Sequence, residues 1–415
     1  IAAYTGASLQ ILAGGSVTIP GAIVITAAGG PFNDGTVVLS NGVPLAVTGT
    51  TQPTLDIRAG TTGFFGTPAA GTPTSANITI GSIANPGGLV LLTNQYQPNR
   101  ALAGGIQVGT ITTTSPAGGG AVVLDSRGGI TFNSIDSSGA PTGNGGDVTL
   151  LSRGDLFMPF PSFIFADGVR GGNITLRSDT AIIQEGAPRG TAPFALSTIQ
   201  SLTLGAVKGG DVRLNAPTIS IAGNVLTVAN GEGEGGSLFL TANALTTSAA
   251  TVATITNGSA RSGAVFVVAN SVALGTFSFL GSASFSGTGG RGGDVTVQTG
   301  SLSAIDGAQM GSFTFGVGDA GNVTVTAQTI ALANFLPADL AAGLFSPTAI
   351  FSSSQPGAVG NSGNITIATG TLTLTGAASV STTAFSQGNA GNIDIRASRL
   401  IQVDGAVFTG PEIDN

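Results

Sequence analysis

The chain has 415 residues, of which 41% are hydrophobic and only 8% charged, and it carries a formal net charge of −7. It contains 67 Gly, a single Lys (Lys208), no Cys and no His. The absent side chains exclude disulfides, thiolate chemistry and histidine-based catalysis, and the few cations do not make the basic surface that a nucleic-acid-binding protein needs. The hydrophobic content is too high for a disordered Gly-rich linker, so we expect a folded protein in which Gly has a structural role. No apolar run reaches the ~18 residues of a membrane-spanning helix, and we expect no membrane insertion.

Residues 1–120 contain short alternating runs of polar and apolar residues, separated by segments rich in Gly and Pro. Such runs are typical of β-strands with one buried side. The clearest examples lie at 14–19, 35–39, 77–80 and 87–91. We predict that these four runs are strands of irregular coils with loop excursions between them.

Residues 121–408 repeat one unit, and its clearest copy spans residues 363–391. This copy has three alternating runs, each ended by Gly or by a cluster of small polar residues, which predicts three strands and three corners. The first Gly of the unit recurs at Gly146, Gly172, Gly210, Gly236, Gly263, Gly293, Gly321, Gly363 and Gly391. A recurrence near 27 residues, with two longer gaps, is typical of a solenoid with insertions at its corners.

Two aliphatic residues, spaced by one, follow each of these glycines. They are Val148/Leu150, Ile174/Leu176, Val212/Leu214, Leu238/Leu240, Val265/Val267, Val295/Val297, Val323/Val325, Ile365/Ile367 and Ile393/Ile395. Residues two apart in a strand point to the same side, so these pairs predict a dry interior sealed by the stacking of coils. The predicted fold is all-β: a single-stranded, right-handed parallel β-helix with three strands per coil and roughly fifteen coils.

The two long gaps place insertions near 184–200 and 334–358, and Pro337 with Leu340 and Leu344 predicts a helical turn or two in the second. Residues 409–415 form a tail. Neither end shows a polar cap, and open strand edges recruit further strands. We therefore expect a stretch of a longer rod, joined either covalently or by head-to-tail self-association of protomers.

The acids that recur in the repeat, Asp147, Asp211 and Asp294, occupy a position where other copies have Asn or Ser. A slot that accepts Asp, Asn and Ser is typical of a corner residue that bonds neighbouring backbone groups, so we favour a structural role over catalysis there. Glu232 and Glu234 form the one local acidic pair, for which a solvated turn is favoured over a calcium site. We accordingly predict no catalytic residue, no metal site and no cofactor.

Phe239 and Phe266 occupy the outward position between the two aliphatic residues in successive coils, where most neighbouring repeats have Thr or Arg. Stacked rungs ~4.8 Å apart would bring the two rings together on the outer wall. They are our candidate surface contact for a partner or a sugar, unless a Phe-rich segment such as 156–165 covers them.

Residues 389–395 (Asn-Ala-Gly-Asn-Ile-Asp-Ile), 319–325 and 362–367 resemble the repeats of cyanobacterial filamentous-haemagglutinin-like exoproteins. Segments 12–19 and 53–60 look like that family as well, whereas its N-terminal secretion domain has no counterpart in this sequence. The resemblance implies two-partner secretion through an outer-membrane transporter and a location outside the cell or on its outer surface. It further implies a fibrous adhesin that contacts cell-surface polysaccharide or other cells. The alternative is a carbohydrate-active enzyme of β-helix fold, a polysaccharide lyase or hydrolase, that uses surface Asp and Arg.

Overall fold

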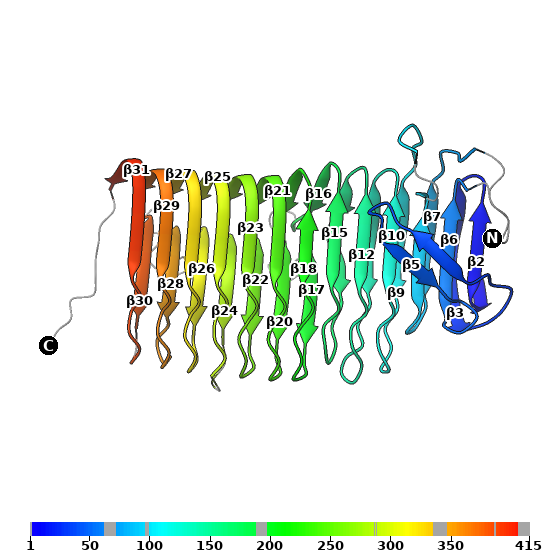
Figure 1. Cartoon of the computed structure of the whole chain (residues 1–415), viewed down its shortest axis with the longest axis horizontal. Helices are drawn as coiled ribbons and strands as arrows, with labels where there is room; N and C mark the ends of the chain where they lie inside the picture. The colour runs from blue at the N-terminus through cyan, green and yellow to red at the C-terminus, as the bar shows by residue number, and fades with distance from the viewer. Residues whose placement is uncertain are drawn as a thin grey trace.

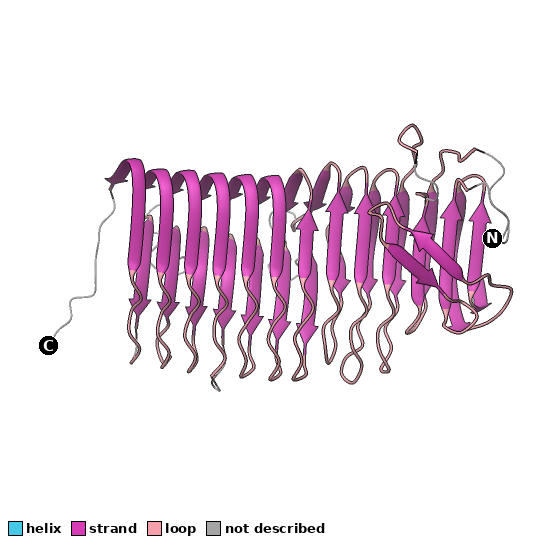
Figure 2. Cartoon of the chain, in the orientation of Figure 1, coloured by secondary structure: helices cyan, strands magenta, loops and turns pink. Residues whose placement is uncertain are grey.

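The computed structural model describes residues 2–61, 72–95, 99–187, 197–285, 287, 289–334, 347–385 and 387–405. Over these residues the chain is all-β and contains no helix, and its strands stack in parallel along one long axis (Figure 1, Figure 2). The architecture is a β-solenoid, with about eleven turns between its two end rungs. The predicted fold class is therefore confirmed.

Each coil passes through three walls, which we name faces A, B and C in chain order. Face A consists of β2 (Leu9–Ala13), β6 (Thr54–Ala59), β8 (Leu89–Thr93), β10 (Val122–Ser126), β12 (Val148–Ser152), β15 (Ile174–Ser178), β18 (Val212–Asn215) and the first parts of β21 (Leu238–Thr247), β23 (Val265–Leu274), β25 (Val295–Ile305), β27 (Val323–Ala333), β29 (Ile365–Thr375) and β31 (Ile393–Asp404). Face B consists of the first parts of β3 (Val17–Ala27), β7 (Ile78–Ala84), β9 (Ile106–Thr112) and β11 (Ile130–Asp136), then β13 (Leu156–Met158), β16 (Ala181–Gln184), β19 (Thr218–Ile221) and the second parts of β21, β23, β25, β27, β29 and β31. Face C consists of β1 (Tyr4–Ala7), the second parts of β3, β7, β9 and β11, then β14 (Phe163–Phe165), β17 (Thr198–Thr203), β20 (Asn224–Ala229), β22 (Thr251–Thr256), β24 (Phe279–Ser284), β26 (Gln309–Thr314), β28 (Ala349–Ser354) and β30 (Ser379–Ala384).

The aliphatic pairs of the repeat form a continuous column on the inner side of face A. Sixteen of the eighteen predicted residues are at most 2% exposed. Ile393, at 42% exposure, and the half-buried Ile395 depart from the prediction because they lie on β31, which among the described strands pairs with β29 alone. The residues between the pairs face outward, so the period-two interpretation is correct for all the inner coils.

The coil count of fifteen was too high, and one predicted coil strand was wrong. Dividing the full length by one period ignores residues that leave the stack, such as those between the end of β3 and the start of β6. Residues 35–39 fall in this excursion, where β4 (Gly35–Val38) and β5 (Pro44–Val47) form an antiparallel hairpin. The hairpin crosses the outside of the N-terminal coils (Figure 1).

More than half of the predicted insertion 184–200, and residues 335–346 of the predicted insertion 334–358, lie outside the described residues. The segment predicted to form a short helix falls in 335–346, and residues 188–196 and 406–415 are likewise not described. Within the part of the chain that is described, the stack continues through residue 120 without a break, because β8, β10 and β12 pair in sequence.

The repeated Gly marks the corner between faces C and A, where successive coils approach most closely. A Cβ placed on Gly321 would overlap the carbonyl oxygen of Gly293 in the preceding coil, and one on Gly363 would overlap that of Gly321. Buried hydroxyls of face C also form hydrogen bonds with the backbone of this corner. Thr254 Oγ1 donates to the carbonyl of Gly263 at 2.6 Å. Gly therefore recurs about every 27 residues because this corner has no room for a Cβ. The buried hydroxyl that bonds the corner backbone recurs with it.

Candidate functional site

The outer wall of face A is covered in its N-terminal part by the β4–β5 hairpin. Phe32, Val37 and Val47 of the hairpin segment join one buried cluster with outward side chains of β8, β10 and β12, which include Leu91 and Leu151. The hairpin thus turns this part of the outer wall into a second hydrophobic core.

A buried carboxylate lies beneath the tip of the hairpin. Asp125 of β10 is 1% exposed, and its Oδ2 accepts a hydrogen bond from the backbone N–H of Ser40 at 2.9 Å. Burial raises the pKa of Asp125 to about 6, although the hydrogen bonds from Ser40 oppose this rise. The covered position makes Asp125 unsuited to contact a polymeric substrate.

Beyond the hairpin the outer wall of face A carries Arg213, Phe239 and Phe266 in three successive rungs, which we call the aromatic strip. The rings of Phe239 and Phe266 stack with centroids 5.2 Å apart and planes inclined by 11°. The guanidinium carbon of Arg213 lies 4.1 Å from the centroid of the Phe239 ring, within cation–π range. Asp211 holds Arg213 in place through an ion pair of 2.8 Å.

The structure places both predicted contact residues on the outer wall. Phe266 is 38% exposed and Phe239 is partly exposed. The Phe-rich segment 156–165 does not cover them, since β13 and β14 belong to faces B and C. A cavity of about 440 Å³ lies alongside Phe239, lined also by Arg177, Arg213 and Thr241. That these residues contact a partner stays a prediction.

The recurring acids at the corner between faces C and A form hydrogen-bonded ladders. Oδ1 of Asp147 accepts the backbone N–H of Asn173 at 2.8 Å, and Oδ1 of Asn173 accepts that of Asp211 at 3.1 Å. The same bond recurs at 2.9 Å from Asn322 N–H to Asp294 Oδ1. These side chains therefore occupy a structural corner position, as the interchange of Asp, Asn and Ser indicates.

The corner cavity around Asp294 and Asp319 is the strongest candidate for the enzymatic alternative. It measures about 200 Å³ and contains two carboxylates and two guanidinium groups. Arg261 pairs with Asp294 at 2.5 Å and Arg291 with Asp319 at 2.9 Å, so one oxygen of each carboxylate is bound. The other oxygen accepts backbone N–H groups of the next coil, at 2.9 Å for Asp294 and 2.8 Å for Asp319. All four oxygens are thus engaged in joining coils.

A second carboxylate pair, Asp136 and Asp167, lies on face C. Burial is the main cause that raises the pKa of Asp167 to about 6, and the charge of Asp136 adds to this rise. Asp167 accepts hydrogen bonds of 2.9 Å from the side chain of Gln200 and from the backbone N–H of Leu202. The contacts fix Asp167 against the next coil, which is again a structural role.

Sequence reasoning missed an aromatic cluster on the outside of face C. Rings from β24, β26, β28 and the corners that follow them are 5.4–6.4 Å apart, and they belong to Phe279, Phe285, Phe313, Phe315 and Phe351. Phe285 and Phe315 are 47% and 46% exposed. Gly281 and Gly311 provide room beneath the cluster, since a Cβ there would overlap the Phe279 and Phe351 rings. The recurrence of Phe about 30 residues apart was the available signal.

Over the described residues there is no group of three or more acidic side chains arranged to hold a metal ion. Glu232 and Glu234 lie exposed on a corner between faces C and A. The described part of the chain also contains no helix with the length and apolarity needed to cross a bilayer.

The fold and the outer wall define a β-solenoid protein with an exposed aromatic and cationic surface on one face. No protein-family model, curated protein or solved structure matches this chain.

Proposed function

We propose that the chain is part of an adhesive rod outside the cell or on its outer surface, which binds cell-surface polysaccharide without catalysing a reaction. The observation that carries the proposal is the aromatic strip. Aromatic rings and an adjacent guanidinium offer stacking surface and polar contact to a sugar, and large exposed aromatic side chains are typical of contact sites.

The corner acids support the proposal because they argue against the enzymatic alternative. A β-helix hydrolase or lyase needs carboxylates free to exchange protons with a substrate in a cleft. Asp294 and Asp319 instead use their oxygens to join successive coils. The enzymatic alternative therefore lacks free carboxylates at its best-placed cavity.

The cellular setting of the proposal rests on the repeat motifs. Their resemblance to filamentous-haemagglutinin-like exoproteins favours export by two-partner secretion through an outer-membrane transporter. Head-to-tail self-association into filaments belongs to the same proposal, and its support is that β31 pairs on one side only within the described residues.

The test is adhesion of beads coated with the chain to immobilised cell-surface polysaccharide. In the double variant Phe239→Ser/Phe266→Ser we expect at least about tenfold weaker retention, because two stacked aromatic contacts are lost. Thr296→Ser/Thr324→Ser, in the same outward column of the next two coils, is the matched control and should leave retention unchanged. Equal retention of both variants and the parent chain would refute the role of the strip.

A further inference from the structure

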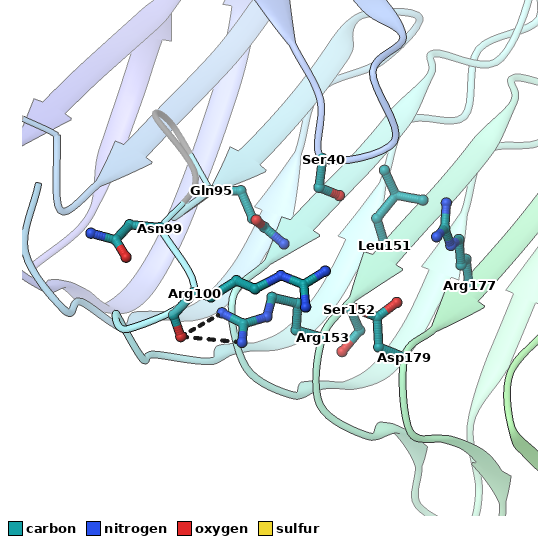
Figure 3. Close-up of a pocket in the computed structure, with 9 residues that line it drawn as sticks. All are labelled: Ser40, Gln95, Asn99, Arg100, Leu151, Ser152, Arg153, Arg177 and Asp179. Carbon is teal, nitrogen blue, oxygen red and sulfur yellow. Dashed lines mark hydrogen bonds between the residues drawn. The ribbon is translucent and has the colours of Figure 1, made fainter.

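Three arginines gather around one cavity beside face A, next to the tip of the hairpin. Arg100, Arg153 and Arg177 line one cavity of about 340 Å³ together with Ser40 at the hairpin tip (Figure 3). We call this cavity the arginine pocket. Its volume lies in the range of about 300–1,000 Å³ that is typical of small-ligand sites.

Within the described residues, none of the three arginines of the arginine pocket forms an ion pair. The described residues contain five ion pairs, and each uses a different arginine from those of the pocket. Arg153 instead donates through both terminal nitrogens to the backbone carbonyl of Arg100, at 3.2 Å each. Asp179 is the one acid among the described residues that line the cavity. Three cations facing one acid, in a chain of net charge −7, make a local excess of positive charge.

The charge of Arg153 also acts on the neighbouring Arg127. Arg127 is 3% exposed and donates to the carbonyl of Thr74 at 2.6 Å. Its pKa is lowered first by burial and then by the charge of Arg153. A bound anion would relieve this repulsion, which is a reason for the site to bind one.

The remaining lining residues are uncharged. Asn99 and Gln95 contribute amides, Ser40 is exposed and contributes a hydroxyl, and Leu151 contributes an apolar side chain. Gln95 is held by a 2.8 Å bond from Nε2 to the carbonyl of Ser126. Guanidinium groups recognise carboxylate and sulfate oxygens in pairs, and amides and hydroxyls suit a polyhydroxylated ligand.

We infer that the arginine pocket binds the anionic group of an acidic oligosaccharide laid along face A. Arg177 also lines the cavity beside Phe239, so the pocket and the aromatic strip form one continuous surface across successive rungs. A uronate carboxylate and a sulfate ester present the same oxygen pattern to the three guanidinium groups. The inference deepens the proposed function, on which it rests for the sugar nature of the ligand.

The experiment is calorimetric titration of the full chain with an oligogalacturonate, a sulfated oligosaccharide, a neutral oligosaccharide of similar length and inorganic sulfate. We expect at least one acidic oligosaccharide to bind about tenfold or more tightly than the neutral one, and to weaken as salt rises. The preferred acid identifies carboxylate or sulfate as the group bound. Binding of inorganic sulfate as tight as that of either oligosaccharide would overturn the assignment to a sugar acid.

The double variant Arg153→Gln/Arg177→Gln should lose at least about tenfold in affinity for the acidic ligand. Arg170→Gln/Arg396→Gln removes the same charge from exposed positions elsewhere and should bind like the parent chain. Thermal unfolding of both variants checks that the fold is intact. Unchanged affinity in the pocket variant refutes the inference. Bead adhesion that survives in this variant but not in Phe239→Ser/Phe266→Ser leaves the proposed function standing.

Discussion

The N-terminal and C-terminal coils differ in which two faces are formed by one continuous strand. In β7, β9 and β11 one strand runs through faces B and C, and face A is a separate strand. From β21 to β31 one strand runs through faces A and B, and face C is separate. Between them, around β12 to β20, all three faces have their own strands.

This difference determines at which corners the chain can hold an inserted segment. Where one described strand passes directly from face A to face B, as in β21 and β23, the chain has no insertion at that corner. In the N-terminal coils the strand is interrupted at the corner between faces A and B. The segment between β8 and β9, which supplies Asn99 and Arg100, leaves from it. The arginine pocket thus lies where the elaborated coils give way to the regular ones.

The interior, in contrast, is the same in both regions. Ile80 in the N-terminal part and Ile367 in the C-terminal part are 2% and 0% exposed, and both belong to one core cluster. Replacing either with Asp should lower the free energy of unfolding by roughly 4 kcal/mol or more, because an unpaired charge would enter a dry core. Chemical denaturation measures the effect. Thr366→Asp, at the exposed neighbouring position, should change stability by less than about 0.5 kcal/mol. A mild effect of Ile367→Asp would contradict the coil assignment.

The hairpin-covered wall should differ from the bare wall in its response to pH. The folded-state pKa of Asp125 is about 6, above its ordinary value of 3.8. Its stabilising contribution is therefore fully present below pH ~4 and is lost as the pH rises through about 6. Asp125→Asn should raise the free energy of unfolding at pH 7 by up to about 3 kcal/mol, and by less as the pH falls toward 4. Thermal unfolding from pH 4 to 8 checks this, and an equal effect at every pH would contradict the buried carboxylate.

The corner ladders should contribute less per residue than the core. Asn322 accepts the backbone N–H of Asn364 at 2.9 Å, and its own backbone N–H donates to Asp294. Asn322→Ala removes the first bond and the long 3.4 Å bond from Asn322 Nδ2 to Asp294 Oδ1, and it keeps the backbone bond to Asp294. We therefore expect a loss of about 1 kcal/mol. Ala264 occupies the same position naturally, and Ala264→Asn should restore the ladder with a gain of similar size. Equilibrium denaturation of the two variants tests both directions, and a neutral Asn322→Ala would show that the ladder does not stabilise the stack.

The sequence predicts those parts of the molecule in which successive coils have the same structure. The inward aliphatic pairs, the corner Gly and the interchange of Asp, Asn and Ser at residues such as Asp147 and Asn173 are periodic, because each coil meets the same neighbours. Residues 35–39 have the same alternating pattern but pair with Pro44–Val47 and pack on an outer wall, which no local signal distinguishes from a coil strand.

The proposed contact surface was predictable only at positions that belong to the repeat. Phe239 and Phe266 stand out because they break the Thr and Arg pattern of one column. Arg100, Arg153 and Arg177 come from three separate segments, and their convergence depends on the path of the excursions. No spacing rule brings Ser40 of the hairpin and Arg153 to the same cavity, since their placement is set by tertiary packing.

The most direct test of the account is to follow an acidic polysaccharide and the purified chain together by size-exclusion chromatography with light scattering. The central claim is that the rod binds such a polymer and leaves it intact. We predict that the chain co-elutes with the polymer and that the molar mass of the polymer stays constant over hours of incubation. A steady fall in that molar mass would identify a depolymerising enzyme and contradict the account.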